Sequence, residues 1–403
     1  MKLEKILRYK KGKSPQKSSS TIDNLVLYLT PEYLRNNSEP NYIPGFSSMI
    51  KVTDKDLVLL WDGSNAGEFF RAKNGVLAST MVKFIFDENE FNTNFLYYQL
   101  KNVEAFLKSQ TNGSGIPHVD KEILLNLELE SFDEPEQDYI AKILLTTDEA
   151  IEQTQALIDK YNRIKRGLMQ ELLTRGIDED GNIRSKQTHK FIVKNGIDIP
   201  EDWDIVRVDE LLNNKGFIQT GPFGSQLHSY EYTYEGVPVI MPQDMLDEIS
   251  TKNINRIPEI KANELDRHRV CENDVIFARR GDLTRCNVIQ SHQVGWLCGT
   301  GCILLRQRNK VFNPDWLRLF YKSFYGQLQV SINAVGSTMA NLSGSLLKNL
   351  WICKVNIEEQ NRIVDRVNQI NRTIQNYIDH RAKLQAVKNG LMQDLLGGKV
   401  RVN

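Results

Sequence analysis

Two kinds of segment in this chain carry residues suited to contacting nucleic acid. One is a glycine-punctuated loop that runs from Gln219 to Gln226, and the other is a set of lysine-rich and arginine-rich stretches. An arginine side chain can hydrogen-bond guanine O6 and N7, whereas lysines and backbone N–H groups hold phosphates. The candidate DNA-contacting residues are Lys10, Lys11, Lys13, Lys17, Gln219, Thr220, Gly221, Phe223, Gly224, Ser225, Arg279, Arg280 and Arg285. A solvated charged surface is the alternative interpretation for any one of them.

Residues that could catalyse a reaction are sparse. Asp244, Glu259 and Lys261 have the types found in metal-dependent nucleases, but chance easily supplies such a set in a chain that is 25% charged. The chain has no phosphate-binding loop, dinucleotide fingerprint, G-x-S-x-G or H-E-x-x-H motif, and no Pro-Pro dipeptide of the amino-methyltransferase signature. We therefore predict a chain without catalytic residues and keep a stand-alone sequence-specific endonuclease as the alternative.

The cysteines form no clear disulfide or metal pattern. Five are present, and no C-x-x-C pair occurs, which disfavours both a disulfide framework and a zinc ribbon. Cys298 and Cys302 lie four residues apart near His292, so a metal site is the alternative. Packing as small hydrophobic side chains is the simpler interpretation, and we predict no metal.

An internal duplication organises the chain. Residues 167–173 (GLMQELL) repeat at 390–396 (GLMQDLL), and the same offset of 223 relates the Glu-Gln pair at 136–137 to the pair at 359–360. The offset falls upstream, to 218 between Asp56 and Asp274, and we align Lys11-Gly12 with Lys215-Gly216 at 204. Such drift indicates insertions in the second copy, so two variable domains each precede a similar terminal segment.

The terminal segments are predicted to be long helices, 134–175 and 357–396. Each begins with a capping box, Asp133-x-x-Glu136 or Asn356-x-x-Glu359, and each runs into glycine at Gly176 or at 397–398. At 1.5 Å per residue each helix would be roughly 60 Å long.

Apolar residues repeat along both helices at a 3.5-residue period, which is typical of a coiled-coil seam. A matching lysine interrupts each seam, at Lys165 and at Lys388. The apolar seam residues are Ile140, Leu144, Ile151, Ile158, Leu168 and Leu172 in the first helix, and Ile363, Val367, Ile370, Ile374, Leu384, Leu391 and Leu395 in the second.

The charges of the two helices favour their pairing with each other. Residues 134–178 hold 6 basic and 9 acidic side chains, whereas residues 357–403 hold 8 basic and 5 acidic ones. Net charges of −3 and +3 disfavour self-pairing of either helix. We expect an antiparallel intramolecular coiled coil, which would place the two globular domains at opposite ends.

The globular parts alternate short apolar runs with turn residues and one amphipathic helix each. Predicted strands are 57–61 and 81–86 in the first part and 237–241, 274–278 and 301–305 in the second, with helices at 94–110 and 315–325. The fold class is α+β: two α/β domains separated by two long antiparallel helices. The predicted division is domain 1 at 1–133, helix 1 at 134–178, domain 2 at 179–356 and helix 2 at 357–403.

Composition excludes several classes of protein. Lys plus Arg equal Asp plus Glu at 51 each, which argues against binding nucleic acid by bulk charge, as histones do. No run of 18 apolar residues and no signal-peptide pattern is present, so we predict a cytoplasmic protein with no membrane contact. Because the globular parts are nearly neutral, we expect the chain alone to bind DNA weakly.

The order of domain, long helix, domain and long helix resembles the DNA specificity subunit of type I restriction–modification systems. The motifs that carry the resemblance are the Glu-Gln pair that opens each helix and the G-L-M-Q-[ED]-L-L run that closes it, and the resemblance in the order of segments covers essentially the whole chain. The loop 221–225 and the Gly-Ser pairs Gly113-Ser114 and Gly336-Ser337 also look like the target-recognition domains of that family, which adds these pairs to the candidate DNA-contacting residues.

The resemblance implies a sequence-specific DNA-binding subunit that reads a split target on double-stranded DNA. It implies partners as well: two methyltransferase (modification) subunits and motor–nuclease (restriction) subunits. S-adenosylmethionine, ATP and Mg²⁺ would bind those partners, and no cofactor is expected in this chain. The coiled coil would set the gap between the half-targets and dock the modification subunits. A purely structural coiled-coil adaptor is a further alternative.

Overall fold

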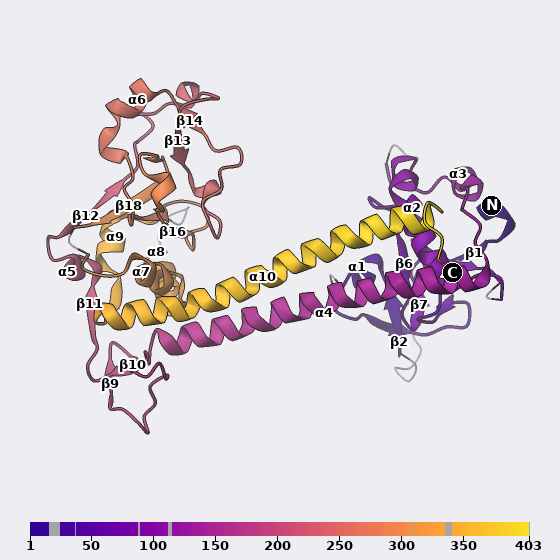
Figure 1. Ribbon diagram of the computed structural model, residues 1–403, viewed down its shortest axis with the longest axis horizontal. Coiled ribbons are helices and arrows are strands. Elements are labelled where there is room, and N and C mark those ends of the chain that lie inside the picture. The colour runs from indigo at the N-terminus through magenta and orange to yellow at the C-terminus, as the bar shows by residue number, and fades with distance from the viewer. Residues whose placement is uncertain are drawn as a thin grey trace. The chain divides into compact units, whose positions relative to one another are not determined.

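The computed structural model describes residues 1–15, 25–36, 38–87, 89–111, 115–308, 310–334 and 341–402. Contacts divide the chain into two compact units: unit 1 is Met1–Leu157 with Tyr377–Asn403, and unit 2 is Ile158–Asn376. Each long helix, α4 (Glu134–Leu172) and α10 (Ile357–Leu396), therefore contributes one part to each unit (Figure 1). The predicted α+β class with two long helices is confirmed.

Unit 1 is built on two sheets. The first has the order β1-β8-β5-β6 and is antiparallel, and the second has the order β3-β2-β7-β4 with β2 and β7 parallel. The strands are β1 (Arg8–Lys11), β2 (Leu25–Leu29), β3 (Tyr42–Pro44), β4 (Lys51–Val52), β5 (Leu57–Leu60), β6 (Phe69–Arg71), β7 (Gly75–Leu77) and β8 (Met81–Ile85). The helices besides the long ones are η1 (Leu3–Lys5), α1 (Pro31–Leu34), α2 (Thr93–Ser109) and α3 (Lys121–Asn126).

Unit 2 repeats this plan with additions. An antiparallel sheet β12-β18-β15-β16 and a sheet β14-β13-β17 with parallel β13 and β17 match those of unit 1, and the pairs β9–β10 and β11–β19 are added. The strands are β9 (Phe191–Lys194), β10 (Ile197–Pro200), β11 (Asp204–Arg207), β12 (Gly216–Thr220), β13 (Val237–Ile240), β14 (Arg256–Ile257), β15 (Val275–Ala278), β16 (Cys286–Val288), β17 (Leu297–Cys298), β18 (Cys302–Gln307) and β19 (Trp351–Lys354). The helices are α5 (Val208–Leu212), η2 (Ser229–Glu231), η3 (Pro242–Asp244), α6 (Glu259–Glu264), η4 (Asp266–His268), η5 (Ser291–Gln293), α7 (Pro314–Lys322), α8 (Phe324–Ala334) and α9 (Gly344–Asn349).

The helix predicted at 315–325 is wrong in one respect, because the structure divides it between α7 and α8. The backbone of Ser323 is extended, and its side-chain hydroxyl donates to the carbonyl of Phe320 at 2.6 Å. The same oxygen accepts the N–H of Gly326 at 3.2 Å. Serine thus supplies bonds that compete with a continuous helix.

Strand registers correct the alignment of the two copies near the start of the chain. Lys11 pairs with Val82 and Thr220 pairs with Ile303, so β1 is equivalent to β12 with an offset of 209. Gly12 therefore corresponds to Gly221, and the predicted match of Lys11-Gly12 with Lys215-Gly216 is wrong. Leu3 and Val208 are also equivalent, because their N–H groups donate to the carbonyls of Leu127 and Leu350, and their offset is 205. The insertion that misled the alignment therefore lies between Val208 and β12.

The long helices begin where the sequence predicts, but only half of each capping box forms. Asp133 Oδ1 accepts the N–H of Glu136 at 3.1 Å, and Asn356 Oδ1 accepts the N–H of Glu359 at 2.8 Å. The carboxylates do not return to the caps: Glu136 binds Arg401, and Glu359 binds three donors of the segment after α4. Gly176 and Gly398 follow the helices with positive φ, as helix-ending glycines commonly do.

Within unit 1 the two long helices run antiparallel. Gln155 hydrogen-bonds Arg381, Asp148 pairs with Lys388 at 2.5 Å, and Glu136 pairs with Arg401 at 2.7 Å. Residue numbers fall along α4 in this series while those of the partners in and after α10 rise, which is the order of an antiparallel pair. Apolar contacts support the same pairing, because Ile140 and Leu144 share a buried cluster with Leu395.

Within unit 2 the end of α4 packs on the start of α10. Leu172 lies in one buried cluster with Ile363 and Val367, and Leu168 packs against that cluster.

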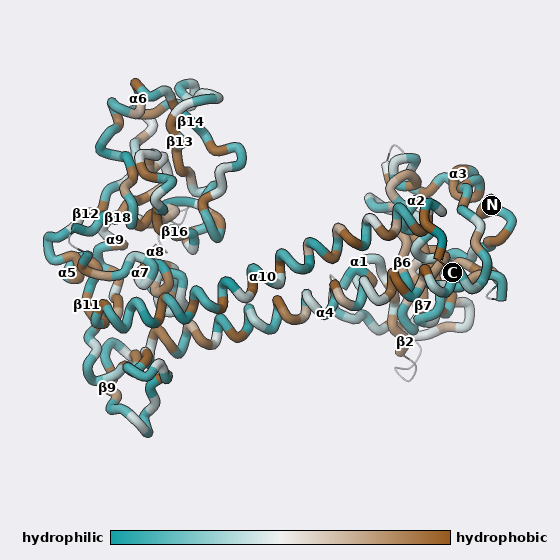
Figure 2. The backbone as a smooth tube through the Cα atoms, in the orientation of Figure 1, coloured by the Kyte–Doolittle hydropathy of each residue, from teal (hydrophilic) through white to brown (hydrophobic). Residues whose placement is uncertain are grey.

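Every predicted apolar seam residue of both helices is buried or half-buried. Figure 2 shows the matching alternation of hydrophobic and hydrophilic residues along α4 and α10.

The glutamine of each Glu-Gln pair holds a domain helix in place. Gln137 Oε1 accepts the N–H of Asn92 at 3.0 Å, and Gln360 Oε1 accepts the N–H of Asn313 at 2.8 Å. Asn92 and Asn313 are themselves the N-caps of α2 and α7. A glutamine on each long helix thereby fixes the start of the helix that packs beneath each antiparallel sheet.

Candidate nucleic-acid interface

In unit 2, four segments meet at the end of β12 and β15, and we call them loop cluster 2: residues 220–225, 279–280, 299–301 and 341–342. The Gly221 N–H donates to the Cys302 carbonyl at 3.0 Å, and the Arg279 N–H donates to the Gly301 carbonyl at 2.7 Å. The Arg279 guanidinium lies 5.6 Å from the ring centre of Phe223 and donates to Asn341 Oδ1 at 3.2 Å. The predicted glycine loop and the predicted arginines are thus brought together.

In unit 1, equivalent backbone contacts assemble loop cluster 1: residues 11–15, 61–63, 78–80 and 117–119. The Gly12 N–H donates to the Met81 carbonyl at 2.8 Å, and the Trp61 N–H donates to the Thr80 carbonyl at 2.8 Å. Lys11 pairs with Asp62 at 2.7 Å. The lysine-rich segment of the first domain and the glycine loop of the second therefore occupy the same place in the two copies, although their sequences differ.

Glycine is required at the start of both loops because another backbone lies against it. A Cβ at Gly12 would lie 2.0 Å from the Ala78 carbonyl oxygen, and one at Gly221 would lie 2.0 Å from the Gly299 carbonyl oxygen. A backbone oxygen cannot move aside as the end of a flexible side chain can.

Gly221→Ala is expected to lower the free energy of unfolding by about 1–3 kcal/mol, because the added methyl group overpacks this contact. Gly224→Ala is the matched control: no atom lies within 4 Å of its Cβ position, so a change within about 0.5 kcal/mol is expected. Urea unfolding followed by tryptophan fluorescence measures both. Equal effects of the two substitutions would show that the close approach is not what selects glycine.

The structure gives the predicted DNA-contacting residues different surroundings. Lys10 and Lys13 are exposed, as are Gly224 and Ser225. Arg280 is exposed and has no ion-pair partner within the described part of the chain. Lys17, Gly113, Ser114, Gly336 and Ser337 lie outside the described residues.

Arg285 lies outside loop cluster 2, and its side chain is hydrogen-bonded to other residues of unit 2. Its guanidinium donates to the Pro242 carbonyl at 2.8 Å and to Asp282 at 3.2 Å. These bonds leave it less able than Arg280 to turn toward a base.

Gln219, which immediately precedes loop cluster 2, contacts a histidine. Its Nε2 donates to the Arg267 carbonyl at 3.0 Å and lies 3.0 Å from His268 Nδ1. His268 is buried, and burial, reinforced by the charge of Arg267, lowers the pKa of His268 to about 4. A neutral imidazole therefore supports this strand end at physiological pH.

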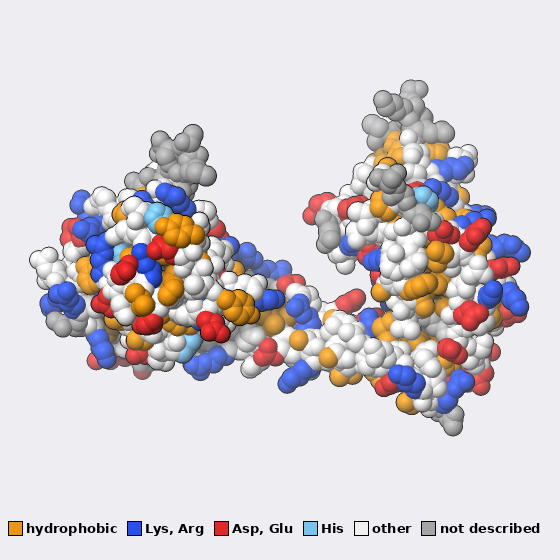
Figure 3. All heavy atoms as spheres, turned by 90° about the horizontal axis from the view of Figure 1, so that it is seen from above, with side chains coloured by type: hydrophobic (Ala, Val, Ile, Leu, Met, Phe, Trp, Pro, Cys, Tyr) orange, Lys and Arg blue, Asp and Glu red, His pale blue; other side chains and the backbone are white. Residues whose placement is uncertain are grey.

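Charge is mixed on the surface rather than gathered into one basic area. On the face that Figure 3 shows, lysine and arginine side chains alternate with acidic ones over both units. This agrees with the equal totals of basic and acidic residues. Any contact with nucleic acid would therefore have to depend on particular loops rather than on a uniformly positive surface.

The nuclease triplet is not assembled. Asp244 accepts the N–H of Met241 at 2.8 Å, Glu259 pairs with Arg269 at 2.7 Å, and Lys261 pairs with Glu231 at 2.9 Å. Each side chain is therefore engaged in a separate local contact. The described residues contain no group of three or more metal-ligating side chains suited to holding an ion.

The cysteines near the predicted alternative metal site are packed in the core. Cys298 and Cys302 are buried in one apolar cluster, and the Cys302 thiol donates to the Ile240 carbonyl at 3.4 Å. Burial raises the pKa of both thiols, which opposes the thiolate form that binds metals.

Comparison with known proteins identifies the family. The model of the type I restriction modification DNA specificity domain matches residues 1–163 and 200–386. This chain belongs to the type I restriction–modification DNA specificity family. The MjaVIII specificity subunit from Methanocaldococcus jannaschii is 30% identical over 98% of this chain and 91% of its own length. The EcoBI specificity subunit from Escherichia coli is 22% identical over 86% and 73%.

A solved structure of the S subunit of a type I system from M. genitalium shares the fold. It has a TM-score of 0.58 and 17% sequence identity, and the match covers 98% of this chain and 95% of that chain. Among the described residues, no helix has the length and apolar character needed to span a bilayer.

Trp61 and Asp62 of loop cluster 1 are not among the residues predicted from the sequence. Their backbone contacts place them where Arg279 and Arg280 lie in loop cluster 2. The signal was present, because the offset of 218 between Asp56 and Asp274 continues to these positions. Neither residue is basic, and basic side chains were the pattern that indicated DNA contact.

Proposed function

We propose that this chain is the DNA specificity subunit of a type I restriction–modification complex and that each unit reads one half of a split target. The observation that carries the proposal is the duplication: two units of the same plan each present a loop cluster at the same sheet end. Reading two separated half-targets requires two reading surfaces, and the duplication supplies both within one chain.

The subunit is proposed to leave catalysis to its partners. Two modification subunits would supply adenine methylation with S-adenosylmethionine, and restriction subunits would supply the ATP-dependent motor and the Mg²⁺-dependent nuclease. The parts of α4 and α10 outside the seam would dock the modification subunits. The dispersed nuclease triplet supports this division of work.

A binding experiment tests the proposal on the purified full chain. Duplex DNA should bind weakly and more weakly still as salt rises, because lysine and arginine contacts release counterions. Arg280→Ala should weaken binding to a target duplex by about tenfold. Lys190→Ala is the matched control, since Lys190 is exposed and lies before β9, outside loop cluster 2.

Two results would contradict the proposal. Cleavage of plasmid by the purified chain with Mg²⁺ would favour a stand-alone endonuclease. DNA binding that is undetectable even at low salt, both for the chain and for its complex with modification subunits, would favour a structural adaptor.

A further inference from the structure

The two loop clusters present opposite chemistry at equivalent positions. The carbonyl of Trp61 accepts the Val119 N–H at 2.9 Å, and the carbonyl of Arg279 accepts the Leu342 N–H at 3.0 Å. Together with the matched bonds of their own N–H groups to Thr80 and Gly301, these contacts equate Trp61 with Arg279. Asp62 is consequently the counterpart of Arg280. A hydrogen-bond acceptor in unit 1 replaces a donor in unit 2.

The backbone around Asp62 is well supported. The Asp62 N–H donates to the Thr80 carbonyl at 3.1 Å, and the following Gly63 N–H donates to the Pro117 carbonyl at 2.9 Å. The ring of Trp61 stacks on Tyr9 with centres 5.0 Å apart and planes inclined by 30°. A side chain that projects from so fixed a backbone can select between bases by its position.

Asp62 and Lys11 form a pair that remains open to solvent. Their atoms are 2.7 Å apart, and the side chains are 29% and 50% exposed, respectively. An ion pair this accessible stabilises the fold by about 1 kcal/mol or less. Exchanging that contact for contacts with a base pair therefore costs little. The pair offers an acceptor and a donor side by side at the surface of loop cluster 1.

We infer that Asp62 and Lys11 determine specificity in the half-target of unit 1 by reading one C·G base pair. The Asp62 carboxylate accepts from the cytosine N4 amino group, and the Lys11 ammonium donates to guanine O6 or N7 across the same pair. The inference rests on the proposed function. In unit 2 the guanidinium of Arg280 can only donate hydrogen bonds. The two units are therefore expected to recognise different bases at this position of their half-targets.

Mapping of methylated DNA in cells that carry this chain with its modification subunits tests the inference. Asp62→Asn should lower the preference for C·G at one position of one half-target by about 5- to 100-fold, because an amide also suits adenine. Lys11→Gln is the second variant and should relax the same base pair. Lys11 is exposed, so this substitution is expected to leave folding intact.

Two controls separate this inference from the proposed function. Asp54→Asn changes an exposed carboxylate of unit 1 outside loop cluster 1 and should leave the target unchanged. Arg280→Ala should alter only the other half-target. If methylation sites depend on the chain but neither Asp62→Asn nor Lys11→Gln changes a C·G position, the inference is wrong and the proposed function stands. If methylation does not depend on the chain, the proposed function itself fails.

Discussion

Replacement of Glu359 by alanine is expected to lower the free energy of unfolding of unit 2 by roughly 3 kcal/mol or more, because it leaves buried donors without partners. Glu359 is fully buried. It accepts from the Ile177 N–H at 2.9 Å, from Arg184 at 3.0 Å and from the Trp203 indole at 3.1 Å. These bonds join the start of α10 to the segment that follows α4.

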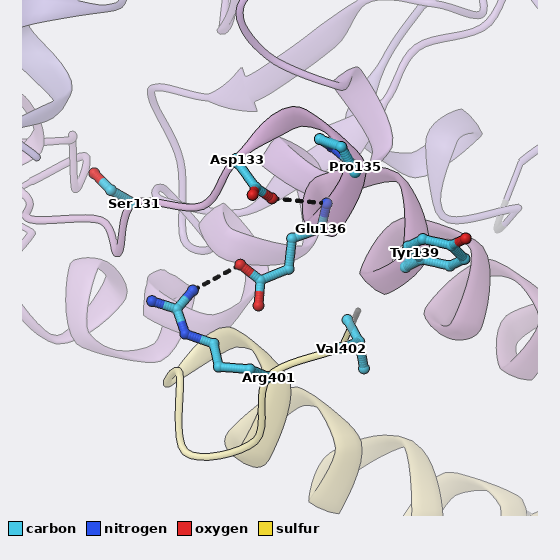
Figure 4. A pocket seen from close by; sticks show the side chains of 7 residues that line it. All are labelled: Ser131, Asp133, Pro135, Glu136, Tyr139, Arg401 and Val402. Carbon is cyan, nitrogen blue, oxygen red and sulfur yellow. Dashed lines mark hydrogen bonds and ion pairs between the residues drawn. The ribbon is translucent and has the colours of Figure 1, made fainter.

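Glu136→Ala is the matched control, because Glu136 occupies the equivalent position at the start of α4. Its described side-chain contact is with Arg401, whose own side chain is 56% exposed. Figure 4 shows the two side chains pointing toward one another. Together with Tyr139 they line a hollow of about 400 Å³. A partly exposed pair of this kind contributes about 1 kcal/mol or less.

Denaturant unfolding followed by tryptophan fluorescence measures both variants. Four of the five tryptophans (Trp203, Trp296, Trp316 and Trp351) belong to unit 2, so the signal reports mainly on that unit. The two units need not unfold together, and each transition is therefore fitted separately. Equal destabilisation by the two alanines would contradict the role assigned to the Glu359 contacts.

Insertion of one heptad into both long helices is expected to abolish methylation at the original target and to create methylation at one with a longer gap. Seven helical residues add about 10.5 Å, which corresponds to roughly three base pairs at 3.4 Å each. The insertions belong after Leu157 in α4 and after Asn376 in α10, where the division between units falls. A heptad keeps the seam in phase on both sides.

A heptad in α4 alone is the control. This insertion moves the apolar seam residues of α4 out of register with those of α10 on one side of the insertion. It should therefore remove methylation at every target. Mapped methylation sites provide the readout for both variants. An unchanged gap with insertions in both helices would show that the paired helices do not set the spacing of the half-targets.

The long helices were predictable because their signals are local and repeated. A period of 3.5 residues over ten seam positions, a polar N-cap and a closing glycine all act within a few residues of the chain. Strands such as β5 and β13 were predicted for the same reason, since short apolar runs between turn residues mark them.

Contacts between distant residues explain what the sequence could not predict. Glu359 looks like the second half of a capping box, yet it bonds Ile177, 182 residues away. Arg285 stays a predicted DNA-contacting residue, but its bond to the distant carbonyl of Pro242 could not be predicted from the sequence. Equating Gly12 with Gly221 required the strand registers, because insertions had changed the offset between the copies.

The proposed division of labour between this chain and modification subunits is tested most directly by mapping N6-methylated adenines across a genome that encodes those subunits, with and without this chain. We predict one split sequence motif that is methylated only when the chain is present. Arg280→Ala should alter one half of that motif while the other half stays unchanged. Methylation of the same motif without the chain would contradict the proposed role of the chain, as would an Arg280→Ala variant that alters both halves equally.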